Sequence, residues 1–130
     1  MTDSLKLVGG GISAVIAFLW GTPDTWLIAL IAFAVLDMIT GLIVAYINKA
    51  IDSSVGLKGV LKKILFFVVV AVANIIDNAA GLNGVVRSAT VGFLVANEGI
   101  SILENCGRVG IKLPQKLIDA LKQLNEGGEK

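Results

Sequence analysis

The sequence has no histidine, a single cysteine and few charged residues, and these shortages exclude several classes of protein. Without histidine, the chain lacks the commonest metal ligand and acid–base side chain. Cys106 alone can form neither an intramolecular disulfide nor a cysteine metal cluster. No Ser-His or Cys-His pair and no phosphate-binding glycine loop is visible. We therefore expect no enzyme activity, no catalytic residue, no metal and no cofactor.

Charge is scarce, and apolar residues take its place. Only 16% of the 130 residues are charged and 55% are hydrophobic, whereas a soluble domain has about 25% charged residues. The net charge of +1 gives no reason to expect a nucleic-acid partner. A chain this short cannot bury several long apolar helices in a water-soluble core. These properties predict an all-α integral membrane protein, a single domain over residues 1–130 surrounded by membrane lipid.

Four apolar runs and one amphipathic stretch make up the expected fold. Residues 27–47 would form a helix about 31 Å long, close to the hydrocarbon thickness of a bilayer. The first run is short and contains three glycines, so three crossings remain if it does not cross; it has no clear signal-peptide cleavage site, and we expect it to be retained. The predicted elements are four membrane helices at about 7–20, 26–48, 62–82 and 85–107, and a C-terminal amphipathic cytoplasmic helix at 114–126.

Basic residues predict the orientation of these helices. With four crossings, ten of the eleven lysines and arginines fall on one side, and only Arg87 falls on the other. Four of the ten belong to residues 49–63, which read as a hydrophilic loop. Because basic loops stay in the cytoplasm, we expect a multi-pass membrane protein with both termini and this loop in the cytoplasm.

Polar residues interrupt the apolar runs at helical spacing, and they are the candidate site. A carboxylate at bilayer depth is costly and indicates function by default. Asp37, Asn74 and Asn97 lie near the centres of three helices, so antiparallel packing would bring them to similar depth. The candidate pore-lining or helix-interface residues are Asp37, Thr40, Gly41, Asn74, Asp77, Asn97, Glu98, Ser101 and Glu104.

The two acids Asp37 and Glu98 carry the strongest signal, because a purely structural role does not need an ionisable group. No lysine or arginine is expected near their depth. Each is therefore expected to be protonated, hydrogen-bonded to an asparagine or serine, or in contact with water. For the amides and hydroxyls, simple bonding between neighbouring helices is an equally good reading.

Several motifs resemble one known family. They are LDMITG at 36–41, the Ser-x-x-Gly-Leu-Lys-Gly pattern ending at Gly59, and NEGISILEN at 97–105, followed by Gly107, Gly110 and Pro114. Over residues 25–124 the chain is similar to the bacteriophage holin family of the toxin-secretion and phage-lysis type. The 97–105 motif is the most specific part of this similarity.

The resemblance implies a homo-oligomer that forms a pore or lesion in the bacterial cytoplasmic membrane. Through it a phage endolysin, or in some relatives a secreted toxin, leaves the cell for host cell lysis or toxin secretion. One alternative is a small dimeric ion channel or proton-coupled exporter that uses an intramembrane carboxylate. Another is a non-conducting partner such as an antiholin.

Overall fold

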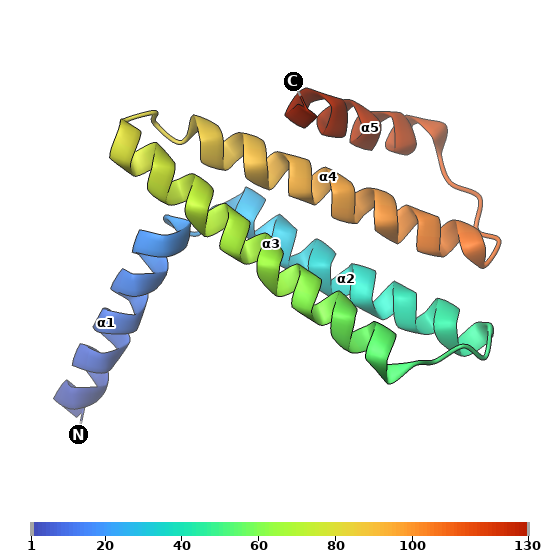
Figure 1. Cartoon of the computed structure of the whole chain (residues 1–130), viewed down its shortest axis with the longest axis horizontal. Helices are drawn as coiled ribbons and strands as arrows, with labels where there is room; N and C mark the ends of the chain where they lie inside the picture. The colour runs from blue at the N-terminus through green and yellow to red at the C-terminus, as the bar shows by residue number, and fades with distance from the viewer. Residues whose placement is uncertain (1, 130) are drawn as a thin grey trace.

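The computed structural model describes residues 2–129, and within that range all regular secondary structure is helical (Figure 1). The helices are α1 (Thr2–Trp20), α2 (Thr25–Ile47), α3 (Ser53–Ala80), α4 (Val85–Arg108) and α5 (Gln115–Glu129). Three of them, α1, α2 and α3, are long and apolar enough to cross a membrane. The sequence prediction of an all-α membrane protein is confirmed to that extent. That α4 crosses and that α5 is cytoplasmic stay predictions.

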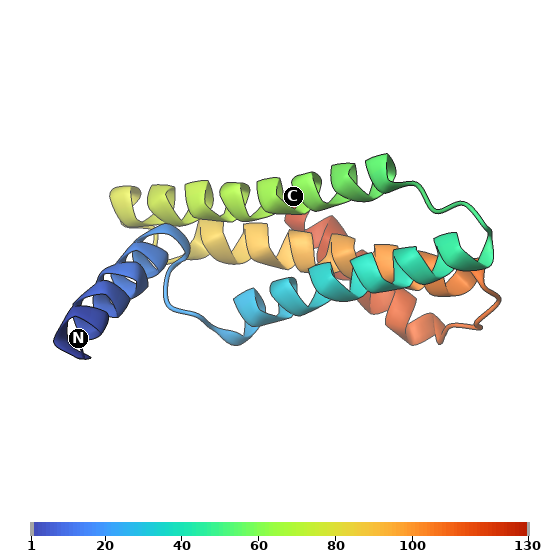
Figure 2. The same ribbon diagram turned by 90° about the horizontal axis from the view of Figure 1, so that it is seen from below.

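The central helix of the bundle is α4. It packs against α2, α3 and α5, whereas α2 and α3 contact each other only briefly. Figure 2 shows α2, α3 and α4 running side by side along the long axis of the molecule. Polar residues on α4 can therefore meet residues of α2, α3 and α5.

Helix α1 stands apart from this bundle. It leaves one end of the bundle and extends across the bundle axis rather than along it (Figures 1 and 2). None of its residues is buried; it lies against α3, and only Trp20 at its end reaches the core among the described residues. The fold of the bundle therefore owes little to the body of α1.

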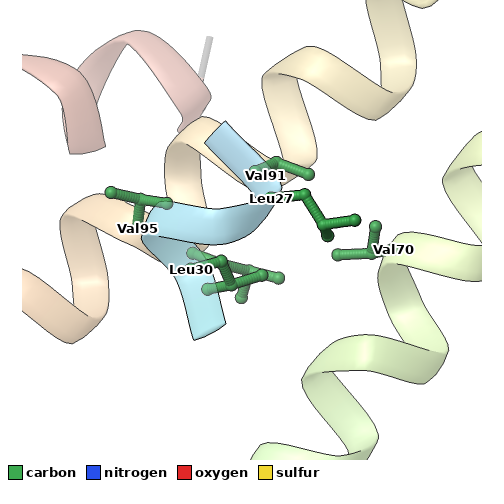
Figure 3. Close-up of a cluster of buried hydrophobic side chains, with 6 residues drawn as sticks. Leu27, Leu30, Val70, Val91 and Val95 are labelled. Carbon is green, nitrogen blue, oxygen red and sulfur yellow. The ribbon is translucent and has the colours of Figure 1, made fainter. Parts of the chain in front are cut away.

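A small apolar core joins α2, α3 and α4. Leu30, Val70 and Val91 are fully buried, and Figure 3 shows the side chains of the three helices meeting there. Most large apolar side chains instead face outward; Leu7, Ile28 and Leu65 are each more than half exposed. So much exposed apolar surface suits lipid and not water.

The hydrophilic loop predicted at 49–63 is wrong, because α3 begins at Ser53. Asp52 caps the helix: its carboxylate accepts hydrogen bonds from the Ser54 amide and hydroxyl, and these bonds lower the pKa of Asp52 below its ordinary value. A helix of 28 residues is about 42 Å long, which is longer than the hydrocarbon layer. The first turns of α3 can thus carry lysines and still continue into the apolar run.

Candidate functional site

Lys63 connects the two acids that the sequence singled out. Its ammonium nitrogen lies 2.6 Å from Asp37 Oδ2 on α2 and 2.6 Å from Glu98 Oε2 on α4. The side chain of Glu98 is 3% exposed, that of Lys63 12% and that of Asp37 18%. One cation therefore joins three helices through two charge-assisted hydrogen bonds in a nearly dry position.

This contact corrects the expectation that no basic residue lies near Asp37 and Glu98. The sequence reading placed Lys63 in a loop, outside the membrane. With α3 starting at Ser53, Lys63 lies almost three helical turns inside the helix, on the face that α2 and α4 cover. Its long aliphatic chain carries the charge to both carboxylates.

Asn105 extends this cluster along α4. Its Nδ2 donates to Asp37 Oδ1 at 3.1 Å and to Thr40 Oγ1 at 2.9 Å. The same amide lies in ordinary contact distance of a side chain built at Gly41. Asp37, Thr40 and Gly41 were predicted site residues, and Asn105 brings them together. With Lys63, Asp37 and Glu98 ionised, the cluster has one negative charge in excess.

The structure places Asn74 and Asp77 in a second cluster, at the other end of the bundle. Asn74 Nδ2 donates to the carbonyls of Phe18 and Leu19 at the end of α1. Asn74 follows Lys63 by eleven residues on α3, about 16 Å along a helix. The prediction that Asp37 and Asn74 share a depth is therefore wrong.

Asp77 is a buried cap for α4. Gly84, the residue before α4, has no side chain that could cap the helix. The Asp77 carboxylate on α3 takes that role and accepts hydrogen bonds from the backbone amides of Val86 and Arg87. Asp77 is only 2% exposed.

Arg87 completes the second cluster. Its Nε donates to the carbonyl of Trp20 at 2.8 Å, and its Nη1 lies 2.9 Å from Asp24 Oδ2. Asp24 in turn caps α2 by accepting from the Leu27 amide. The hydrogen bond from Arg87 is the largest cause that lowers the pKa of Asp24. Together these bonds fix the end of α1 to the starts of α2 and α4.

The remaining predicted residues form a stripe along α4 that no other helix covers completely. Asn97 and Ser101 are half-buried and Glu104 is exposed. The Ser101 hydroxyl donates only to the carbonyl of Asn97 in its own helix. Among the side chains that the structure describes, no hydrogen bond or ion pair joins Asn97, Ser101 and Glu104 to another helix. We call these three residues the open stripe.

Sequence reasoning missed Lys63, Asn105, Arg87 and Asp24 as site residues. Asn105 belongs to the NEGISILEN motif and lies seven residues, about two turns, after Glu98. That spacing alone could have placed it on the face of Glu98. Asp24 is the acidic residue just before α2, a usual capping position. Nothing in the sequence pairs it with Arg87, which is 63 residues away.

Comparison with known proteins agrees with the motifs. A family model described as the bacteriophage holin family matches residues 14–126. The chain belongs to this family. A Bacillus phage phi105 protein described as "Probable holin" is 39% identical over 105 residues, covering 81% of this chain and 77% of its own length.

Proteins of bacteria are also similar to this chain. A Clostridium perfringens protein described as an uncharacterized 14.9 kDa protein in the nagH 3' region is 41% identical over 115 residues, or 88% of this chain and 87% of its own. The Bacillus subtilis protein YqxH is 37% identical over 100 residues, or 77% and 71% of the two chains. No solved structure matches the chain.

Proposed function

We propose that this chain acts as a holin. Copies would assemble in the bacterial cytoplasmic membrane and open a pore or lesion that releases a phage endolysin, or a toxin, for host cell lysis or secretion. Family membership and the apolar helices support this role. The proposed function is mechanical and needs no catalytic residue.

The open stripe is the observation that carries the proposal. In lipid, polar side chains without a partner are costly, so Asn97, Ser101 and Glu104 favour contact with water or with another copy. Several α4 helices arranged around a centre would place their stripes along a shared aqueous opening. In such an arrangement each α4 helix is polar on the side of the opening and apolar on the side of the lipid.

The other predicted residues have a different role in this proposal. Asp37 and Glu98, held by Lys63, join α2, α3 and α4 into one rigid unit, with Thr40 and Gly41 against Asn105. Asn74 and Asp77 hold the opposite end of the bundle. The pore-lining role therefore belongs to Asn97, Ser101 and Glu104, and the other six residues are helix-interface residues.

The packing of α4 supports a proposed orientation. Because α4 lies along α2 and α3 (Figure 2), we propose that it crosses with them. The lysine-rich start of α3 and the C-terminus then share the cytoplasmic side. In a Cys106→Ser background, a cysteine at Gln115 should react with an impermeant thiol reagent only in inside-out vesicles. A cysteine at Ser4 reports whether α1 adds a fourth crossing.

Dye release from liposomes tests the function. The purified wild-type chain should release carboxyfluorescein above a threshold protein-to-lipid ratio, because a lesion needs several copies. The variant with Asn97, Ser101 and Glu104 all changed to leucine should insert equally well and release little dye.

Ser88→Leu is the matched control for this triple change. Ser88 is an exposed polar residue at the start of the same helix but lies off the open stripe. It should leave dye release at the wild-type level. Equal leakage from the triple variant and the wild type would reject the open stripe as the lining, and a wild type that never leaks would reject the holin function.

A further inference from the structure

A polar cavity of about 480 Å³ opens where the end of α1 meets the starts of α2 and α4. Its polar lining residues are Thr22, Asp24, Asn74, Asn78 and Arg87. Ligand pockets in proteins are commonly about 300–1,000 Å³ in volume, so this cavity has room for a small polar group. The proposed pore does not use any of these residues as its lining.

The cavity lies at a membrane surface when α2, α3 and α4 cross the bilayer. The connections 21–24 and 81–84 are both at this end of the bundle, and the lysines at the start of α3 are at the other end (Figure 2). This level is the same with three or four crossings, whichever end faces the cytoplasm. Trp20 and Trp26 flank the connection between α1 and α2, and tryptophan is enriched at the level of lipid headgroups. The cavity therefore opens among the headgroups.

Apolar side chains are exposed beside the cavity. Phe18 on α1, next to the lining residue Ala17, is 61% exposed. Ile75 on α3, next to Asn74, is 38% exposed. These side chains give the acyl chains of a lipid an apolar surface that adjoins the polar cavity, whereas a water-soluble ligand would gain nothing from them.

Asn74 contributes an acceptor without a partner to the cavity wall. The residue is 5% exposed, and its Nδ2 donates to the carbonyls of Phe18 and Leu19 at 3.0 Å and 3.2 Å. Because those carbonyls only accept, they fix which end of the amide is the nitrogen. Among the described residues no donor reaches Asn74 Oδ1, which lies 3.1 Å from a side-chain carbon built at Gly21, another lining residue. A buried carbonyl oxygen without a donor is costly, so Oδ1 favours a ligand that donates.

Arg87 and Asp24 add one charge of each sign. The guanidinium has five N–H groups; one donates to the Trp20 carbonyl and two donate to the Asp24 carboxylate, which leaves two for an anionic group. The Asp24 side chain is 47% exposed and can accept further hydrogen bonds. A purely anionic ligand would be repelled by Asp24, and a purely cationic one by Arg87. The cavity therefore suits a group that has an anion and hydrogen-bond donors side by side.

We infer that this cavity binds a phospholipid headgroup with an N–H donor beside its phosphate, the headgroup of phosphatidylethanolamine. The phosphate accepts from Arg87, and the ammonium donates to Asp24 and to Asn74 Oδ1. An ammonium is a better partner for a carboxylate than the hydroxyls of phosphatidylglycerol, because both members of the pair are charged. Phosphatidylcholine has the same phosphate but no N–H group. This inference goes beyond the proposed holin function and adds a specific lipid site at the membrane surface.

Lipid binding by the wild-type chain is the first test. The full chain in detergent is titrated with phosphatidylethanolamine, phosphatidylglycerol and phosphatidylcholine of identical acyl chains, and bound lipid is counted by native mass spectrometry. Phosphatidylethanolamine should bind about tenfold more tightly than phosphatidylcholine, since a hydrogen bond to a charged group contributes enough for that ratio. Equal binding of these two lipids, or tighter binding of phosphatidylglycerol than of phosphatidylethanolamine, would overturn the inference.

Asp24→Asn tests the place of the ammonium. Asparagine still caps α2 but leaves Arg87 without its counter-charge. The preference for phosphatidylethanolamine over phosphatidylcholine should fall to about threefold or less, and phosphatidylglycerol should bind more tightly than it does to the wild type. Asp119→Asn removes the same charge from an exposed residue of α5 outside the cavity lining and should leave all three affinities unchanged. If Asp24→Asn keeps the wild-type affinities, the assigned site is wrong.

A soluble competitor separates a membrane lipid from a free headgroup. Glycerophosphoethanolamine has the same phosphate and ammonium but no acyl chains to lie against Phe18 and Ile75. At the concentration of the lipid it should displace little, and displacement of half of the bound lipid would overturn a lipid as the occupant. The comparison of lipids on the wild type needs no variant, so misfolding of Asp24→Asn does not remove the test. None of these measurements needs a pore, so they succeed or fail independently of dye release from liposomes.

Discussion

The two polar clusters of the bundle stabilise the same three helices by different means. In the cluster around Arg87, Asp77 and Asn74, side chains bond mainly to backbone groups at helix ends. In the cluster around Lys63, side-chain charges face one another within the bundle. In the Arg87 cluster each side chain has its own backbone partners, so loss of one hydrogen bond leaves the others intact. The Lys63 cluster depends on one cation shared by two acids.

The largest expected effect is loss of that cation. Lys63→Met leaves Asp37 and Glu98 close together without a counter-charge, and removal of one partner of a buried ion pair costs about 3–5 kcal/mol. Unfolding in mixed micelles should show a loss of this size. Met supplies similar volume without charge, so packing is conserved.

A compensated variant separates charge from structure in this prediction. Lys63→Met combined with Asp37→Asn and Glu98→Gln removes all three charges and should recover most of the stability. If Lys63→Met alone is as stable as the wild type, the two ion pairs contribute nothing to stability. The proposed difference between the clusters would then be wrong.

The next effect concerns the cap of α4. Asp77→Ala leaves the amides of Val86 and Arg87 without their acceptor, and a lost helix cap costs about 1–2 kcal/mol. Hydrogen exchange at the start of α4 should accelerate while exchange around Lys63 stays slow. Asn78→Ala, at an exposed neighbour, is the control. Acceleration at both ends would show that the two clusters are not independent.

Two glycines with positive φ, one inside the Arg87 cluster and one outside it, test how rigid this cluster is. Gly21 has a φ of 79°, and an added Cβ would lie 3.1 Å from Asn74 Oδ1 and 3.2 Å from Arg87 Nε. Gly84 has a φ of 84° and no such neighbour. Alanine at either position carries the backbone strain of about 1 kcal/mol. Gly21→Ala should destabilise the protein more than Gly84→Ala in thermal unfolding, and equal losses would show that Asn74 and Arg87 shift freely.

The smallest expected effect is a dependence on acid pH. Arg87 lowers the pKa of Asp24 below its ordinary value of 3.8, so this stabilisation is present above that value. It is lost as the pH falls through the lowered pKa. Because Asp24 is half exposed, the effect is small. Between about pH 5 and about pH 3, the wild type should lose more thermal stability than Asp24→Asn; parallel curves would contradict this.

The sequence predicted the helices well and the pairing of their polar residues poorly. Apolar length and helical spacing located α2 and α4 closely, and they marked Asp37 and Glu98 as a site. They failed at Lys63, because a lysine-rich stretch before an apolar run is typical of a loop. Asp52, as a possible helix cap, was the signal that the helix begins before these lysines. They also failed at Arg87, since its partners on the α1–α2 connection become neighbours only through packing.

The way α1 is attached has a consequence for sequence variation. Its hydrogen bonds to the bundle come from its last turn: the carbonyls of Phe18, Leu19 and Trp20 accept from Asn74 and Arg87, and the Trp20 indole donates to α3. None of its residues is buried. Replacement of one apolar residue by another near Leu7 or Ile12 should therefore leave the bundle intact. The first helix can drift in evolution while its final turn stays fixed.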